Sequence, residues 1–286
     1  MTLSGFDAQS REALQGCYPE QSTRLHHGLA GHPLLQPEAL IDLAHRIAAE
    51  DILCFRGDIP IDPGTDGAPP TGLSPEDTIR NITTNKSWMV LKKVEQDPEF
   101  EALLRGLLAE MDDVVVPKTG PMLNREAFIF VSSPGSVTPF HLDPEHNILM
   151  QLTGTKTMTV FPQANERLVS SEAHEEFHQS GKYNLAWQAD FAALGTPYAL
   201  KPGDALYVPV KAPHWVKNGD EPSISLSVTW RSDWSYNEQY ARQFNAMIRQ
   251  LGITPAPPKR FPHRNLVKSL AWRSVDKARR TIGRTS

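Results

Sequence analysis

The chain has 286 residues, of which 40% are hydrophobic and 22% are charged, and its formal net charge is -4. This composition is that of an ordinary globular protein, and one domain of this length buries a sizeable core. The apolar runs are too short to span a membrane, and the polar N-terminus MTLSGFDAQSREAL does not resemble a signal peptide. The two cysteines, Cys17 and Cys54, have no metal-binding spacing. We therefore expect a cytoplasmic protein without a membrane span.

The charge is unevenly distributed along the chain. Residues 259–286 contain nine lysines and arginines and one acid, so this tail carries +8 and the remainder carries -12. Such a tail could meet an acidic partner, a nucleic acid or a membrane surface. We favour a basic helix that lies on its own acidic domain, because solvated charged faces are common. Nothing beyond this tail indicates nucleic acid.

Helices are expected to dominate the first third of the chain. One helix is predicted over residues 36–50, with Pro37 at its first position, and another over residues 97–111. The Pro- and Gly-rich stretch GDIPIDPGTDGAPPTG, residues 57–72, lies between them. A connection of this length is uncommon in compact domains and is often a surface insertion or a lid.

From Ala127 the pattern changes to short strands separated by turn signals. Five apolar segments are each bounded by Gly, Pro or Asn: AFIFV, NILMQL, KTMTVF, DALYVPV and SISLSVTW. Pro202-Gly203 is typical of a type II turn and Asn218-Gly219 of a hairpin. Several strands with few helices between them indicate a mainly β fold, either an antiparallel barrel or a double-sheet jelly roll.

After Trp230 the sequence returns to a helical pattern. Ser235 and Glu238 are predicted to form a capping box, followed by an apolar stripe at helical spacing. PAPPKRFPHR ends that helix, and a last amphipathic, basic helix is predicted in the tail. We therefore divide the chain into a domain of residues 1–232, with helices at its N-terminal side, and a helical, basic appendage of residues 233–286.

His141 and Asp143 lie two residues apart in strand-like sequence. Side chains at positions i and i+2 of an extended segment leave the same face, so both are able to bind one ion. A second histidine would complete the two-His-one-carboxylate triad, which holds Fe(II) and leaves three positions open for other ligands. His214 is the candidate, because it follows the apolar strand of GDALYVPVKAPHW and could reach the same barrel mouth.

A cation is predicted inside the barrel. If residues 153–154 form a two-residue hairpin loop, Gln151 faces Lys156. Strand alternation then puts Asn147, Gln151 and Lys156 on one interior face. A buried lysine is costly unless it meets an anion, and the far carboxylate of a metal-chelating 2-oxo acid would supply one, with help from the Thr138 hydroxyl. The alternative is a solvated Lys156 on the outer face, where most lysines lie.

Two segments resemble a known family. TPFHLDPEHNILMQLTGTK (138–156) and PGDALYVPVKAPH (202–214) are similar to the JmjC-type, cupin-fold Fe(II)/2-oxoglutarate-dependent oxygenases. The similarity is greatest to the protein-hydroxylase branch that includes the asparaginyl hydroxylase acting on hypoxia-inducible factor. The matching region spans roughly residues 128–230. The resemblance implies a double-stranded β-helix core between an N-terminal helical region and a C-terminal helical appendage.

The resemblance also implies a role for each matching residue. It implies three iron ligands: His141, Asp143 and His214. It implies that Lys156 and Thr138 hold the distal carboxylate of 2-oxoglutarate, and that Asn147 lines its metal end. The reaction so implied consumes O2, releases succinate and CO2, and hydroxylates a C–H bond of a protein or peptide side chain or of a small molecule. Related hydroxylases form homodimers through their C-terminal helices, so a homodimer is expected here.

Two positions depart from the pattern of that family. A tyrosine that often assists the co-substrate, well before the first histidine, has no counterpart in this chain. An asparagine often found on the strand after the last histidine is replaced by a hydroxyl-bearing face of Ser225, Ser227 and Thr229.

A competing motif occupies residues 174–184, HEEFHQSGKYN. On a helix, His174 and His178 would share a face, with the intervening Glu as the general base of a zinc hydrolase. However, Phe177 is almost the only apolar residue of the segment, whereas a catalytic helix must pack in a core. Asn184 stands where a third histidine is expected. We therefore expect a solvated helix between strands.

A protein without catalytic activity is the second interpretation of this sequence. A cupin with an absent or inert metal site would be a binding or regulatory module, but the full triad together with Lys156 and Thr138 favours an enzyme.

His146 follows Pro144-Glu145 and is expected at the rim of the site. The tryptophans able to line a substrate groove are expected in the core instead: Trp88, Trp187, Trp215 and Trp234.

Overall fold

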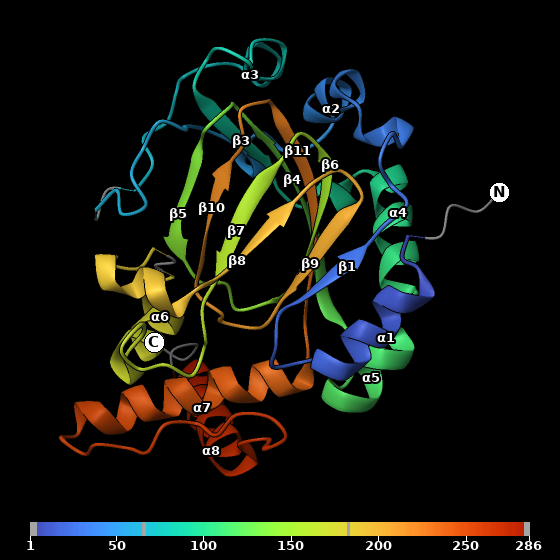
Figure 1. Ribbon diagram of the computed structural model, residues 1–286. Coiled ribbons are helices and arrows are strands. Elements are labelled where there is room, and N and C mark those ends of the chain that lie inside the picture. Colours follow the sequence, from blue (N-terminus) through green and yellow to red (C-terminus); the bar gives the residue numbers. More distant parts are fainter. Residues whose placement is uncertain (1–4, 65–66, 182–183, 283–286) are drawn as a thin grey trace.

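Two antiparallel β-sheets face each other in the computed structural model of this chain, which describes residues 5–64, 67–181 and 184–282 (Figure 1). The larger sheet has seven strands in the order β1-β9-β6-β11-β4-β3-β2, and the smaller has four in the order β5-β10-β7-β8. Helices α1, α4 and α5 lie beside the larger sheet, and α7 and α8 lie across the lower end of both (Figure 1). The predicted mainly β cupin fold with flanking helices is confirmed.

The strands include all five that the sequence predicts, as β4, β6, β7, β9 and β11. The larger sheet contains β1 (Thr23–His26), β2 (Ile52–Arg56), β3 (Ser87–Leu91), β4 (Leu123–Ser132), β6 (His146–Thr153), β9 (Asp204–Val208) and β11 (Ser223–Arg231). The smaller contains β5 (Val137–His141), β7 (Lys156–Val160), β8 (Thr196–Leu200) and β10 (His214–Asn218). The first third of the chain thus supplies β1, β2 and β3 as well as helices, and these strands lie at or next to the edges of the larger sheet. These strands are short, so their alternation is a weak signal.

Eight α-helices and four short 3-10 helices occur in the described ranges. The α-helices are α1 (Ala8–Cys17), α2 (Pro37–Ala44), α3 (Pro75–Arg80), α4 (Pro98–Ala109), α5 (Asp112–Thr119), α6 (Ser171–Ser180), α7 (Asp233–Gln250) and α8 (Leu266–Ile282). The 3-10 helices are Pro33–Leu35, Ala49–Asp51, Val94–Gln96 and Ala189–Leu194. The helix predicted over 36–50 thus ends early, at Ala44. In these ranges, no helix combines the length and the apolar character needed to cross a bilayer.

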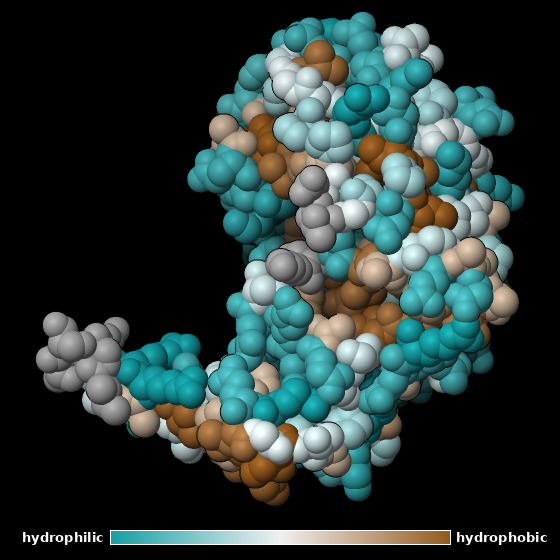
Figure 2. All heavy atoms as spheres, turned by 90° about the vertical axis from the view of Figure 1, so that its left-hand side faces the viewer, coloured by the Kyte–Doolittle hydropathy of each residue, from teal (hydrophilic) through white to brown (hydrophobic). Residues whose placement is uncertain are grey.

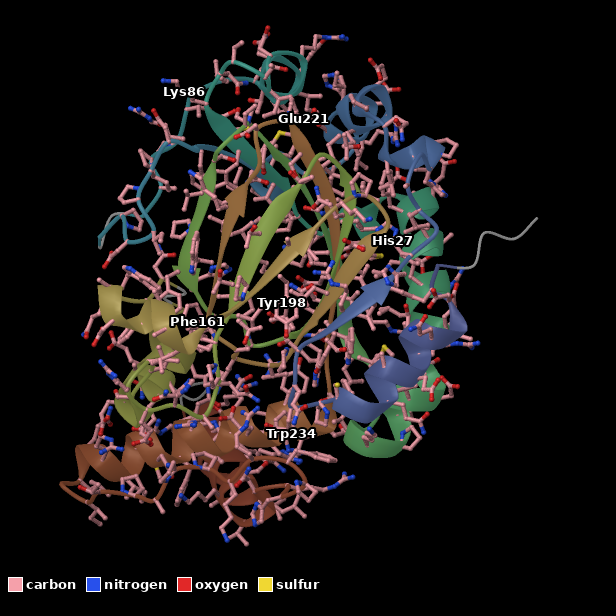
Figure 3. The ribbon with its side chains drawn as sticks, in the orientation of Figure 1. His27, Lys86, Phe161, Tyr198, Glu221 and Trp234 are labelled. Carbon is pink, nitrogen blue, oxygen red and sulfur yellow. The ribbon has the colours of Figure 1, made fainter. Side chains whose placement is uncertain are left out.

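Alternation along β11 separates an apolar layer from a polar interior. Leu226, Val228 and Trp230 belong to the core between the larger sheet and the helices. The intervening hydroxyl-bearing residues face the interior between the two sheets, where a smaller apolar cluster includes Leu149 and Met158. A third cluster lies next to α6 and contains Phe161, which Figure 3 labels at the lower end of the strands.

Two turns connect the sheets instead of closing hairpins. β6 and β7 lie in different sheets, so the predicted pairing of Gln151 with Lys156 is wrong. Asn218-Gly219 likewise leads from β10 in one sheet to β11 in the other. Period-2 alternation shows which face of its own strand a residue occupies, but it does not identify the partner strand. The predicted burial is nevertheless confirmed, although the pairing used to derive it is wrong: Asn147, Gln151 and Lys156 are all buried.

The C-terminal helices differ from the prediction in detail. α7 begins at Asp233, and its capping box joins Ser232 with Ser235, so the predicted box of Ser235 and Glu238 is wrong. Glu238 is buried instead, and it pairs with Lys211 from the body of the protein and with Arg242 of α7 itself. The predicted basic helix is α8, which packs against α7, while its C-terminal part projects from the body (Figure 2).

Candidate metal and co-substrate site

The two sheet strands that carry His141 and His214 bring these residues face to face. His141 ends β5, His214 begins β10, and the two pair in the antiparallel register. Asp143 Oδ2 lies 3.8 Å from His141 Nε2 and 3.6 Å from His214 Nε2. Because one ligand atom of each residue lies within 4.8 Å of the others, a single ion is able to contact all three. It is the one such group of His, Cys, Asp or Glu found among the described residues.

Backbone contacts orient both imidazoles toward this point. His141 Nδ1 lies 2.7 Å from the Pro139 carbonyl oxygen, and His214 Nδ1 lies 2.9 Å from that of Ala212. A carbonyl oxygen only accepts, so each Nδ1 donates and each Nε2 keeps a free lone pair. Burial lowers the pKa of His214 to about 4, and His141 adds to this shift while Asp143 opposes it. His214 is therefore neutral at pH 7.

Lys156 lies inside the barrel and is only 5% exposed. Its ammonium donates to Ser225 Oγ at 2.7 Å, and no carboxylate of the described residues forms an ion pair with it. Burial lowers the pKa of Lys156 to about 7. Val160, opposite His214 in the sheet, is four residues from Lys156, or about 13 Å of strand. The cation thus lies well inside, away from the triad.

Polar side chains continue from the triad toward Lys156. Thr138 and Asn147 line the same cavity as His141. Ser227 Oγ donates to Asn147 Oδ1 at 2.6 Å. Since Ser227 and Ser225 leave the same face of β11, these hydroxyls form a row that joins Asn147 to Lys156. The sequence departure on this strand is therefore a set of hydroxyls that contact two of the three predicted co-substrate residues.

A cavity of about 490 Å³ opens beside the triad. Its lining includes His141, Asp143 and aromatic residues from β2, β3 and β4: Phe55, Trp88, Phe128 and Phe130. The prediction of Trp88 in the core does not anticipate this position in the cavity wall. Ala68 of the 57–72 stretch also lines the cavity. Among these aromatic residues the sequence singled out only Trp88, because β2 and β3 were not predicted and the predicted strand β4 gave no sign that Phe128 and Phe130 line a cavity.

The two residues after Pro144 have opposite surroundings. Glu145 lines the cavity, and burial, reinforced by the charge of Asp143, raises its pKa to about 8. His146 points to the other face of β6, where its ring contacts the hydroxyls of Tyr18, Tyr207 and Ser232. The prediction of His146 at the rim is therefore wrong, since adjacent residues of a strand leave opposite faces.

The HEEFH segment forms α6, but this helix is not solvated. His174, Glu175 and Phe177 are buried, because α6 packs against α7. Glu175 accepts hydrogen bonds from Arg249 of α7. Burial, and then the charge of Lys211, lowers the pKa of His174 and of His178 to about 2. The predicted solvated helix is wrong, and in the described chain these two histidines belong to no three-residue metal-binding group.

The fold and this site define a cupin, and comparison with known proteins identifies the family. The model of the cupin-like domain family matches residues 76–236, which is more than half of the chain. The chain therefore belongs to the cupin-like domain family. The similarity to JmjC-type cupins stated from the two sequence segments is confirmed by the curated relatives described next.

Two curated relatives illustrate the extent of this similarity. Jumonji C domain-containing protein 5 of Drosophila melanogaster is 27% identical over 171 residues, or 53% of this chain and 41% of that protein. Lysine-specific demethylase JMJ30 of Arabidopsis thaliana is 31% identical over 178 residues, or 56% of this chain and 37% of that protein. The chain thus matches less than half the length of either relative.

A solved structure shows the same fold. The crystal structure of ycfD from E. coli superposes with a TM-score of 0.51 and 18% sequence identity, covering 91% of this chain and 66% of that chain. The superposition covers more of the present chain than the family match does.

Proposed function

We propose that this protein is an oxygenase that uses Fe(II), 2-oxoglutarate and O2. The observation that carries the proposal is the convergence of His141, Asp143 and His214 beside the cavity, with both Nε2 atoms free. Two imidazoles and one carboxylate are the donor set suited to Fe(II) with open positions. Bound iron and 2-oxoglutarate would supply an oxidant for a C–H bond, with release of succinate and CO2.

The chain's own residues would bind and orient the co-substrate. Lys156 is a buried ammonium whose described contact is a neutral hydroxyl, so a carboxylate would remove a desolvation cost that the fold leaves in place. Thr138 would add a hydroxyl donor to the same carboxylate. Asn147, held by Ser227, would contact the end of 2-oxoglutarate nearest the metal.

The proposed substrate is a side chain of a protein or peptide, with a small molecule as the alternative. A cavity of about 490 Å³ lies within the range of ligand pockets. The Arabidopsis relative is named as a lysine-specific demethylase, which favours a protein substrate. The reaction would be hydroxylation, or demethylation where the oxidised carbon is an N-methyl group that leaves as formaldehyde.

We propose that the appendage of residues 233–286 forms a homodimer. Its exposed apolar residues are Leu251, Ile253, Leu266, Val267 and Leu270, and hydrophobic atoms gather at the lower end of the molecule in Figure 2. Exposed apolar surface of this kind is typical of an interface. Light scattering should give twice the monomer mass for the wild type and the monomer mass for Val267→Glu. A monomeric wild type would contradict the dimer.

Turnover of 2-oxoglutarate tests the proposed enzyme. Succinate should form with iron, ascorbate and a panel of candidate peptides and metabolites, and His141→Ala and Asp143→Ala should reduce it to background through loss of bound iron. The exposed His45 provides the control, because His45→Ala removes an imidazole outside the site. Retained turnover with stoichiometric iron in either variant would refute the triad. Absence of succinate in the wild type would favour a non-catalytic cupin module.

A further inference from the structure

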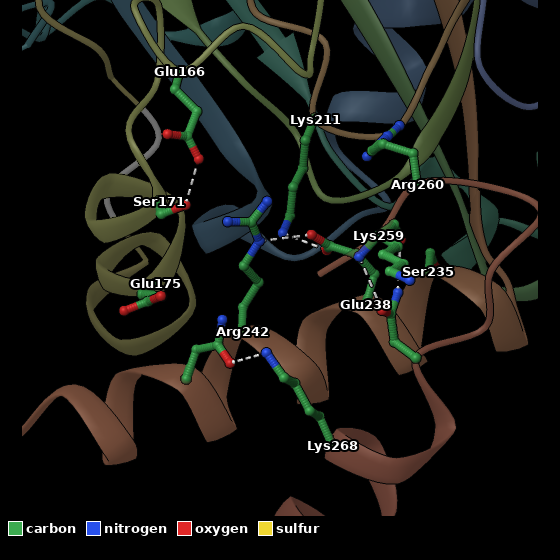
Figure 4. A network of polar contacts seen from close by, with 12 residues as sticks. Glu166, Ser171, Glu175, Lys211, Ser235, Glu238, Arg242, Lys259, Arg260 and Lys268 are labelled. Atoms are coloured by element: carbon green, nitrogen blue, oxygen red, sulfur yellow. Dashed lines mark hydrogen bonds and ion pairs between the residues drawn. The ribbon is translucent and has the colours of Figure 1, made fainter. Parts of the chain in front are cut away.

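A second polar pocket of about 330 Å³ lies between α6, α7 and the segment that precedes α8. Three cations line it: Arg242, Lys259 and Arg260. One carboxylate, that of Glu166, also lines it, together with His174. Figure 4 shows Glu166, Arg242, Lys259 and Arg260 around this region. None of these residues belongs to the cavity beside the triad.

Both arginines of the pocket have a guanidinium nitrogen that donates no hydrogen bond. Arg242 is 6% exposed, and its Nε donates to Glu238 Oε1 at 2.8 Å, but its buried Nη1 has no hydrogen-bond partner. Arg260 Nε donates to Glu20 Oε2 at 2.9 Å, while its buried Nη2 has no partner either. Buried donors without partners are rare in folded proteins and indicate a ligand or ordered water.

The histidine of the pocket has a free ring nitrogen as well. His174 is 3% exposed, and its Nδ1 is buried without a hydrogen-bond partner. Its depressed pKa leaves the imidazole neutral at pH 7, so one ring nitrogen carries a proton that can be donated. The negative charge of Glu166 disfavours an anion in the pocket. Its Oε1 accepts a hydrogen bond from Ser171 Oγ at 2.7 Å.

We propose that this pocket binds a phosphate group, as inorganic phosphate or as a small phosphomonoester. Guanidinium donors match phosphate oxygens in geometry and charge, and two arginines from different segments offer such donors here. The lining has three cations and one carboxylate, and Glu238 and Glu20 each accept from one arginine, so the preference for an anion rests on the unused Nη donors of both arginines. The cavity volume leaves room for an ester group beyond the phosphate. The site uses none of the residues of the proposed iron centre, so it stands independently of that function.

A chain of contacts joins the pocket to the triad. Arg242 pairs with Glu238, and Glu238 Oε2 lies 2.5 Å from Lys211 Nζ (Figure 4). The backbone N–H of Lys211 donates to the carbonyl oxygen of Asp143 at 2.8 Å. Because Arg242 contributes both to the pocket and to this chain, a ligand on its free Nη1 would contact the network that supports the segment before His214.

Calorimetric titration with sodium phosphate at pH 7.5, against sodium chloride of equal ionic strength, tests the proposal. Phosphate should bind saturably to the wild type and raise its melting temperature, as ligands of the native state do. Arg242→Gln should weaken phosphate binding at least tenfold, as expected for loss of a hydrogen bond to a charged group. Glycerol phosphate and acetate complete the set of probes, and acetate should bind more weakly than either phosphate.

Matched variants decide between a phosphate site and general screening. Arg249→Gln removes the same charge from the same helix, but Arg249 pairs with Glu172 and Glu175 outside the pocket lining, so it should leave binding unchanged. Lys259→Gln, at an exposed position, should weaken binding and serves if Arg242→Gln does not fold. Stabilisation by chloride equal to that by phosphate would overturn the proposal. Undiminished phosphate binding in Lys259→Gln and Arg242→Gln, or acetate binding as tight as phosphate, would overturn it as well.

Discussion

The interior of the barrel and the interface beneath it each bury a lysine, but only the lysine of the interface has a carboxylate partner among the described residues. Lys211, next to α7, is 1% exposed and lies 2.5 Å from the carboxylate of Glu238, which also pairs with Arg242. Lys156, inside the barrel, contacts the hydroxyl of Ser225. Burial lowers the pKa of both lysines, and Glu238 opposes this shift at Lys211. A buried charge that the chain itself neutralises supports packing, whereas one without a counter-charge is suited to an anionic ligand.

The largest effect on stability is expected at the neutralised lysine. Burial opposes ionisation of Glu238, but Lys211 and Arg242 outweigh it and hold its pKa well below the usual range. Glu238→Gln would leave two buried cations without their counter-charge, so the free energy of unfolding should fall by about 3–5 kcal/mol. Urea denaturation measures this change. Glu221→Gln, at an exposed acid (Figure 3), should change it by less than about 0.5 kcal/mol. Equal effects of the two variants would remove the distinction between the regions.

A smaller effect, on the co-substrate alone, is expected at the unpaired lysine. Lys156→Met should raise the 2-oxoglutarate concentration needed for half-maximal turnover by at least tenfold, because a charge-assisted hydrogen bond to a carboxylate is lost. Iron affinity should be unchanged, since Lys156 lies about 13 Å of strand from the position opposite His214. Succinate formation and iron titration give the two values. An unchanged co-substrate requirement would remove Lys156 from its proposed role.

The last effect is a pH dependence of stability that arises at Lys156. The pKa of Lys156 is about 7 in the folded protein and 10.5 in its ordinary range. Between these values the unfolded state binds more protons, so the wild type gains stability as pH rises, and the cost of the buried charge is full below pH 7. Lys156→Met lacks this cost. Its stability advantage over the wild type should therefore shrink by on the order of 2 kcal/mol from pH 7 to pH 9.

The control for this measurement is another lysine of the smaller sheet. Lys217 is exposed on β10, so Lys217→Met should show a difference from the wild type that does not vary with pH. Urea denaturation at pH 7, 8 and 9 provides the comparison. A constant difference for Lys156→Met over this range would show that its ammonium is not desolvated in the folded protein.

Local patterns in the sequence were sufficient for a large part of the fold and of the candidate site. Alternation in β4, β6 and β11 predicted strands, and the i, i+2 spacing of His141 and Asp143 predicted that their side chains share a face. The position of α4 followed from Asp97-Pro98, where Asp97 caps the helix. Each of these predictions depends only on neighbours along the chain.

Contacts between distant segments decided the rest. The chain folds into two sheets, and β6 and β7 belong to different ones. The predicted pairing of Gln151 with Lys156 is therefore wrong. Packing of α7 on α6 buried His174, although the composition of α6 is that of a solvated helix. The ion pair of Lys211 with Glu238 likewise joins residues 27 positions apart. Periodicity in the sequence shows which face of its own helix or strand a residue occupies. Burial and charge pairing depend on which other element covers that face, and only the tertiary structure decides this.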